Sequence, residues 1–256
     1  MMPSSLIVMM KCFQAWWSWR TKQGKRKVKK QDSGLRRQSA QSRLSQRSTS
    51  DATRALADWN ERNGFCACCG RPMRTVDGER KRKCCGPKEH TVYPRVDPVV
   101  CMLVESPDQN RALLVRARNS KFPAGMVTCP TGFVEQAESA EQACIREVLE
   151  ETGVNIDPDT VELVHTQAWP QGWAGTCELM IGCTARAVHD ALKPNLREMA
   201  EVEWVHRNEI LARIAEAGHD DPSGSSEIGR DFELPFQDTI GYRLLIEWCG
   251  PSKVEE

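Results

Sequence analysis

The sequence predicts an α+β protein whose helices and strands pack in layers, and two observations support this class. Strand-like and helix-like segments mix along residues 99–248, without the regular strand–helix–strand repeats of a doubly wound parallel sheet. A separate cluster of cysteines precedes this region and indicates a small module of its own. The chain therefore divides into a basic tail over residues 1–50, a helix with a cysteine-rich module over 51–95, and the layered domain over 96–256.

Each element of this plan follows from a local pattern. Residues 52–65 place their apolar side chains on one face of a helix. Short apolar and β-branched runs predict strands at 99–105, 111–117, 161–169, 177–188 and 201–206. The last strand leads into a helix near 207–217, a Gly- and Ser-rich loop at 220–230 follows, and a helix at 238–248 closes the domain.

The net charge of zero conceals two oppositely charged regions. Residues 1–50 carry 12 of the 35 Lys and Arg residues and only one of the 35 acidic residues, which leaves the rest of the chain with a net charge of −11. A body that acidic is a poor electrostatic match for nucleic acid or an anionic membrane, so a protein of this kind would need metal ions to handle phosphates. No apolar run approaches the length of a membrane span, and we expect no membrane partner.

The basic tail has two equally supported interpretations. Its nine serines, its arginines and its near lack of acids are typical of an organellar transit peptide, which would send the protein to a mitochondrion or plastid. The same composition fits a disordered, solvated tail on a cytoplasmic protein. A nuclear signal in "GKRKVKK" is a weaker third reading.

Five of the 12 cysteines lie within 20 residues and indicate a metal site rather than a disulfide framework. Cys66 and Cys69 form a CxxC pair, and a third ligand follows at Cys84 or Cys85. His90 is the candidate for the fourth ligand of a tetrahedral zinc, which would be structural because four protein ligands leave no open position for chemistry. Spare thiols, or a former zinc site that has lost ligands, are the alternatives.

A second metal site is expected on a glutamate-rich helix. Ser139 and Gln142 predict a capping box at its start, and Gly153 suits its C-terminal cap. Three carboxylates, those of Glu147, Glu150 and Glu151, share one face at spacings of three and four residues, where like charges repel. Divalent cations such as Mg²⁺ would remove that repulsion, and Arg146 could orient one carboxylate. The alternative is a solvated acidic face.

The full spacing around this helix resembles the Nudix box. The matching positions are Gly132, Glu138, Arg146, Glu147, Val148, Glu150, Glu151, Gly153 and Val154. A CxxC cluster, "YPRVDPVV", the box and then "TQAWP" are together similar to the NADH pyrophosphatase branch of Nudix hydrolases. The resemblance implies a Nudix α/β/α sandwich with a mixed sheet, preceded by a zinc ribbon. Ala168, Gln171 and Gly172 depart from the branch's motif, which leaves the substrate preference open.

The resemblance also implies roles for individual residues. Mg²⁺ or Mn²⁺ would be bound by Glu147 and Glu151, by the Thr131 carbonyl and by Glu198, while Glu150 and Arg146 would complete the catalytic group. Substrate contacts would fall on Tyr93, Phe133, Gln167, Ala168, Trp169, Pro170 and Gly241. The implied reaction splits the diphosphate of NADH, NAD⁺ or a related dinucleotide into AMP and nicotinamide mononucleotide. Alternatives are removal of an NAD cap from RNA and a zinc-ribbon interaction module that binds a nucleotide without cleaving it. The sequence leaves a homodimer open.

Overall fold

The computed structural model describes residues 52–120, 122–123, 125–170, 172, 177–217 and 232–250. The basic tail and the loop expected at 220–230 lie outside these residues. Within the described part of the chain, every helix is too short or too polar to cross a membrane.

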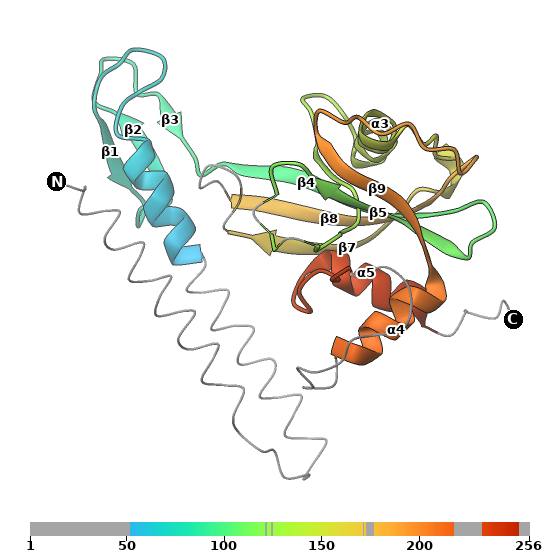
Figure 1. The fold of residues 1–256 in the computed structure, drawn as a ribbon. Coiled ribbons are helices and arrows are strands. Elements are labelled where there is room, and N and C mark those ends of the chain that lie inside the picture. Colours follow the sequence, from blue (N-terminus) through green and yellow to red (C-terminus); the bar gives the residue numbers. More distant parts are fainter. Residues whose placement is uncertain are drawn as a thin grey trace, which may run out of the picture. The chain divides into compact units, whose positions relative to one another are not determined.

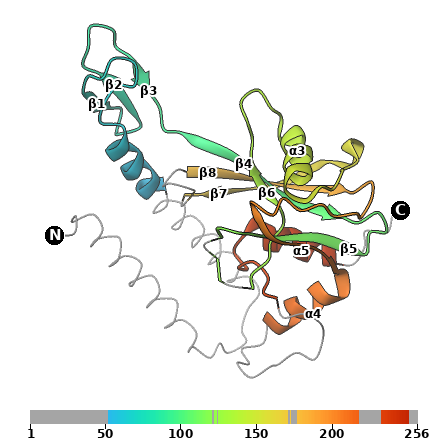
Figure 2. The same cartoon turned by 45° about the horizontal axis from the view of Figure 1, so that its top comes forward.

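The first described region, called here the cysteine module, spans residues 52–93. It consists of the expected helix, which covers residues 52–62, and a three-stranded antiparallel sheet (Figures 1 and 2). The strands are β1 (Met73–Val76), β2 (Lys81–Cys84) and β3 (Thr91–Val92), in that order across the sheet. The buried apolar core of the module is only three residues, Cys66, Met73 and Cys84, with Val92 packed against them.

The second region, called here the sheet domain, spans residues 96–250 and contains a six-stranded sheet of order β7-β8-β4-β5-β9, with β6 paired to β4. The pairing of β4 with β8 is parallel and the other pairings are antiparallel, which gives the mixed sheet that was expected. The bounds are β4 (Val96–Glu105), β5 (Arg111–Ala117), β6 (Thr131–Phe133), β7 (Glu162–Trp169), β8 (Cys177–Arg186) and β9 (Met199–His206). All but β6 were predicted; three residues are too few to carry a strand pattern.

Helices cover both faces of this sheet, and the side chains of β4 alternate between them. Cys101 and Leu103 pack toward α4 (Arg207–Ala217) and α5 (Ile240–Cys249), whereas Val100 and Met102 pack toward α3 (Ala140–Thr152) (Figure 1). A short 3₁₀ helix, Pro158–Thr160, precedes β7. Because a strand buried on both faces has no polar side, β4 reads as a continuous apolar run. The α/β/α sandwich is confirmed.

The ends of α3 are as the sequence predicted. The Gln142 amide donates to Ser139 Oγ over 3.2 Å, the Ser139 amide donates to Gln142 Oε1 over 2.9 Å, and Gly153 adopts φ 75° at the C-cap. The helix buries Ala143, Cys144 and Val148 against the sheet, whereas Leu149 is exposed.

Candidate active site and metal centres

The approach of α3 to the sheet depends on a missing side chain at Gly132 in β6. A Cβ atom there would lie 2.0 Å from Cδ of Glu147, a distance that no side chain could tolerate. The glycine therefore allows the Glu147 carboxylate to lie directly against the β6 backbone. Its neighbour Thr131, opposite Cys101 in the β4–β6 pairing, lies in the same three-residue strand. Coordination by the Thr131 carbonyl stays a prediction.

Arg146 fixes the loop before α3 and the surface of the helix at once. Its guanidinium donates two bonds of 2.8 Å to the Glu138 carboxylate and one of 2.8 Å to the Phe133 carbonyl. It also lies 2.9 Å from a Glu147 oxygen and 3.3 Å from one of Glu150, which is exposed. The hydrogen bond from Arg146 lowers the pKa of Glu138, so the Arg146–Glu138 pair stays charged. We therefore assign Arg146 a positioning role.

Glu151 is the most perturbed carboxyl group of the helix. Its side chain is buried, with 7% exposure, and Oε2 has no hydrogen-bond partner within the described part of the chain. Burial raises the pKa of Glu151 to about 8, with further contributions from the charges of Glu147, Glu198 and Glu150. Burial likewise raises the pKa of Glu147. A buried carboxylate oxygen without a donor is unfavourable unless a cation completes it, so this donor set fits a divalent metal.

The opposite face of the sheet carries a row that we call the aromatic strip. Its residues lie directly opposite one another on neighbouring strands: Phe133, Val99, Met180 and Gln167, with Trp169 two positions along β7 on the same face. Phe133 is exposed and Trp169 half-buried. Since Gly132 faces α3 and the flanking Phe133 faces the strip, β6 joins the glutamates to the aromatic residues.

Gln167 and Gly241 position the start of α5 beside the aromatic strip. The Gln167 side chain donates to the Asp238 carbonyl and accepts from the Ile240 amide, both over 2.7 Å. Both polar atoms of the Gln167 side chain, Nε2 and Oε1, thus form hydrogen bonds within the protein. Gly241 is buried, and a Cβ atom there would lie 3.2 Å from Thr128 Oγ1, so its role is to let α5 pack closely on the sheet.

Three other expected substrate residues are spread out. Ala168 is exposed on the opposite face of β7 from Gln167 and Trp169, because successive side chains of a strand alternate. Its side chain therefore does not join the strip, and a substrate contact at Ala168 stays a prediction. Pro170 is half-buried at the end of β7, and Tyr93 is exposed after β3.

Sequence reasoning missed two carboxyl groups beside Trp169. Asp97 and Glu178 are both buried, at 8% exposure, and lie directly opposite each other in the parallel β4–β8 pairing. Glu178 is in turn opposite Trp169 on β7. A Cβ atom at Gly172 would lie 2.3 Å from Glu178 Oε1, so the glycine in this departure from the family motif permits close approach. The sequence signal that could have indicated them is an acidic residue at a position of β4 and of β8 where the strand pattern predicts a buried side chain.

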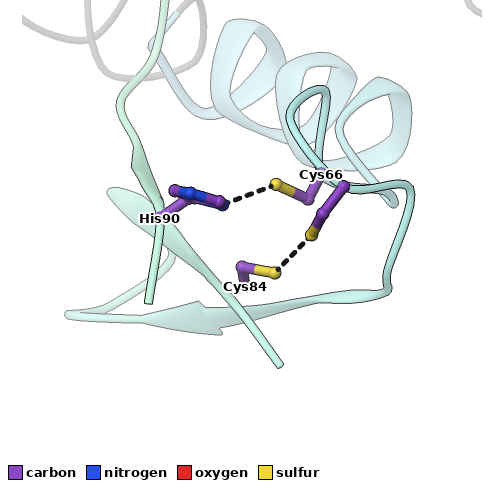
Figure 3. Close-up of side chains that lie close together, drawn as sticks. Cys66, Cys84 and His90 are labelled. Carbon is purple, nitrogen blue, oxygen red and sulfur yellow. Dashed lines mark hydrogen bonds between the residues drawn. The ribbon is translucent and has the colours of Figure 1, made fainter. Parts of the chain in front are cut away.

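The cysteine module brings four metal-ligand atoms together. The Sγ atoms of Cys66, Cys69 and Cys84 and a ring nitrogen of His90 all lie within 4.8 Å of one another. Figure 3 shows Cys66 and His90 pointing toward each other, with 3.4 Å between Sγ and Nδ1. The Sγ atoms of Cys69 and Cys84 are also 3.4 Å apart. Three sulfurs and one imidazole are the donor set of a closed tetrahedral zinc site.

Of the two candidates for the third ligand, the structure places Cys84 in the cluster. Cys84 is buried in the cluster, where its sulfur accepts a 3.2 Å hydrogen bond from the Gly86 amide, whereas Cys85 is exposed and outside it. Burial raises the pKa of Cys66, but hydrogen bonds from the Cys68 and Cys69 amides and from His90 outweigh it and bring the pKa to about 6. Cys66 is therefore prepared to act as a thiolate, the form that binds metal.

Comparison with known proteins identifies relatives of the sheet domain and beyond. The family model described as the NUDIX domain matches residues 95–223. NAD-capped RNA hydrolase NUDT12 of Homo sapiens is 39% identical over 204 residues, covering 76% of this chain and 40% of the relative. NAD(P)H pyrophosphatase NUDT13, mitochondrial, of Homo sapiens is 32% identical over 198 residues, with coverages of 76% and 52%.

A plant protein is also similar. Nudix hydrolase 19, chloroplastic, of Arabidopsis thaliana is 36% identical over 166 residues, covering 64% of this chain and 37% of the relative. The chain thus spans from roughly two fifths to half of the length of these three relatives.

Proposed function

Because the chain belongs to the NUDIX family, we propose that it hydrolyses the diphosphate linkage of NADH, NAD⁺ or a related dinucleotide to AMP and nicotinamide mononucleotide. The observation that carries this proposal is Glu151, a buried carboxyl group beside the charges of Glu147 and Glu198, whose Oε2 has no hydrogen-bond partner among the residues that the structure describes. A protein that only bound a nucleotide would gain nothing from like charges held together at the helix surface.

The residues suited to hold Mg²⁺ or Mn²⁺ are Glu147, Glu151 and Glu198, with the Thr131 carbonyl as a further ligand. When bound, such cations supply neutralisation of the diphosphate charge and activation of a water molecule. The protein's own contribution is to hold the carboxylates in place. Arg146 does so by tying Glu138, Glu147 and the Phe133 carbonyl together. A glutamate that is not saturated by metal is the expected proton acceptor for the attacking water.

The aromatic strip is our candidate for the dinucleotide site. Phe133 and the Gln167 position are separated by three strand spacings, or about 14 Å, which suits an extended dinucleotide with a base near each end. Phe133 would stack on one base and Trp169 on the other. The Asp97–Glu178 pair lies at the Trp169 end, where Arg95 donates to the Asp97 carboxylate.

We assign the cysteine module a structural zinc, held by Cys66, Cys69, Cys84 and His90. The small core of the module supports this assignment, because three buried apolar residues cannot stabilise it alone. We also propose that residues 51–95 and 96–256 are separate modules. For residues 1–50 we propose a role in targeting only, which a fusion of this segment to a fluorescent reporter would test; diffuse cytosolic signal would count against it.

The experiment that tests the proposal is a hydrolysis screen of the full chain with Mg²⁺ or Mn²⁺. Its substrates are NADH, NAD⁺, ADP-ribose, diadenosine polyphosphates and RNA with an NAD cap, with products identified by chromatography. We expect AMP and nicotinamide mononucleotide from NADH, and nicotinamide mononucleotide with 5′-phosphorylated RNA from capped RNA. If NADH binds but no products form with either Mg²⁺ or Mn²⁺, the proposal is contradicted and the chain is a nucleotide-binding module.

A further inference from the structure

The cysteine module is basic, whereas the sheet domain that follows it is acidic. Residues 51–95 contain ten Lys or Arg and six Asp or Glu, a net charge of +4, whereas residues 96–256 contain 13 and 28, a net charge of −15. The net charge of −11 over residues 51–256 conceals this difference between the two regions. An anionic partner excluded electrostatically from the sheet domain is therefore attracted to the module.

Three cations of the module share one face of the small sheet. Arg74 and Lys83 lie directly opposite each other in the β1–β2 pairing, and Lys81 is two positions from Lys83 on the same side of β2. Like charges directly opposite each other destabilise a sheet. One acid, Glu89, serves both members of the pair, at 3.6 Å from Arg74 and 2.9 Å from Lys83. Lys81 is in turn paired with Asp77 over 3.0 Å, so three cations face two acids and one positive charge is left uncompensated.

The other face of the same sheet is occupied by the module itself. Arg82, between Lys81 and Lys83, donates 3.0 Å hydrogen bonds to the Asn60 side chain and to the Met73 carbonyl. Since Asn60 belongs to the helix of residues 52–62, that helix covers the face opposite the lysines. The side of Arg74, Lys81 and Lys83 is thus the outward side.

An exposed aromatic ring accompanies these charges. Phe65 is 72% exposed and forms a β-bridge with Pro72, two positions before Arg74, which places both on the outward side. We call Phe65, Arg74, Lys81 and Lys83 the basic face. Cationic side chains beside an exposed ring are the combination that binds single-stranded nucleic acid, through phosphate contacts and base stacking.

We propose that the basic face binds single-stranded RNA, and so docks the RNA body of an NAD-capped substrate. The cleavage part of this statement rests on the proposed function, whereas the docking part does not. Charge complementarity selects a polyanion, and the exposed ring selects one with unpaired bases. A free dinucleotide has no RNA body and makes no use of this surface.

The test compares two charge-reversal variants of the full, zinc-loaded chain. The first is Arg74→Glu with Lys83→Glu; the matched control is Arg54→Glu with Arg62→Glu, which makes the same charge change on the helix. Fluorescence anisotropy with a labelled 12-nucleotide single-stranded RNA measures binding, and kcat/KM is measured on NADH and on NAD-capped RNA. Zinc content and circular dichroism establish that each variant is folded.

We expect the basic-face variant to bind the RNA at least tenfold more weakly than the control, with a shallower salt dependence, because each phosphate contact contributes to the slope. Its kcat/KM on capped RNA should fall by the same factor while that on NADH is unchanged. Phe65→Ala should weaken binding by roughly fivefold or more, the effect of one lost stacking contact. Arg74→Lys with wild-type Lys83 should retain binding.

Equal RNA affinity in the basic-face variant and the control would overturn the proposal. So would an equal loss of activity on NADH and capped RNA in a folded variant, since the face would then serve the active site. Binding of the RNA with no hydrolysis of any substrate would contradict the proposed function and keep the docking surface. Equal binding of a duplex of the same length would overturn the assignment to single strands.

Discussion

The cysteine module and the sheet domain each bring candidate metal-ligand side chains together, but the apolar cores that support these side chains differ in size. In the module, Cys66 and Cys84 are ligand candidates and at the same time two of the three core residues. In the sheet domain, Glu147 and Glu151 stand on a helix that closes a complete core on one face of the sheet, with a second core on the other. A metal in the module would therefore be part of folding, whereas metals at the glutamates would act on a fold that is already stable.

The largest effect should come from removing zinc ligands. Cys66→Ser combined with Cys69→Ser should abolish zinc binding and unfold the cysteine module, because structural zinc supplies on the order of 10 kcal/mol to small modules of this kind. The sheet domain should keep its cooperative unfolding. The zinc content, measured by metal analysis, should fall from about one equivalent per chain to none.

The matched control for this double variant is Cys68→Ser with Cys85→Ser, two exposed cysteines outside the cluster. It should keep its zinc and its melting temperature. Zinc retained by the Cys66/Cys69 variant, or lost by the control, would show that the ligand set is different.

The next effect concerns catalysis without loss of fold. Glu147→Gln and Glu151→Gln should each lower kcat on NADH by on the order of 10²- to 10⁴-fold at saturating Mg²⁺. Thermal unfolding should show that both variants stay folded, since neither side chain is part of an apolar core. Glu141→Gln, an exposed position in the first turn of the same helix, is the control and should be nearly unaffected. Turnover near wild type in either site variant would remove the metal assignment.

A smaller effect follows from the raised pKa of Glu151. In metal-free protein this pKa is about 8, above its ordinary value of 4.5, so the folded state keeps a proton that the unfolded chain releases. The contribution of Glu151 to the free energy of unfolding should therefore be largest below pH 4.5. This contribution should fall as the pH rises to about 8. We expect a fall on the order of 2 to 4 kcal/mol, measured by urea denaturation.

Glu151→Gln should flatten this part of the pH profile, because the amide does not titrate. Saturating Mg²⁺ should flatten it as well. Profiles of wild type and variant that coincide between pH 5 and pH 8 would mean that Glu151 ionises without penalty, and that the site is less buried than the structure has it.

The smallest effect is expected at the aromatic strip. Trp169→Ala should raise KM for NADH, NAD⁺ and ADP-ribose together by up to about tenfold, the value of one stacking contact, with little change in kcat. Initial-rate kinetics on the three substrates measure this. A drop in kcat alone would mean that Trp169 helps to position the glutamates and does not contact the substrate.

Local patterns made most of the fold predictable. The caps of α3 at Ser139 and Gly153 depend only on neighbouring residues, and the two-sided burial of β4 is visible as an unbroken apolar run. The choice of Cys84 over Cys85 was not predictable, since the two are adjacent and only the register of β2 decides which one points inward. Asp97 and Glu178 are 81 positions apart in the sequence, so no local pattern could predict that they pair.

The most direct test of the difference between the two metal sites is a selective removal of the weakly bound cations. The full, zinc-loaded chain is passed into buffer with a chelator that takes Mg²⁺ and Mn²⁺ but is too weak to compete for a closed cysteine–histidine site. Hydrolysis of NADH, zinc content and circular dichroism are then measured on one sample. We predict that hydrolysis stops and returns on addition of Mg²⁺, while zinc content and secondary structure stay constant. Hydrolysis that persists without Mg²⁺ and Mn²⁺, or that returns only with zinc, would contradict the account.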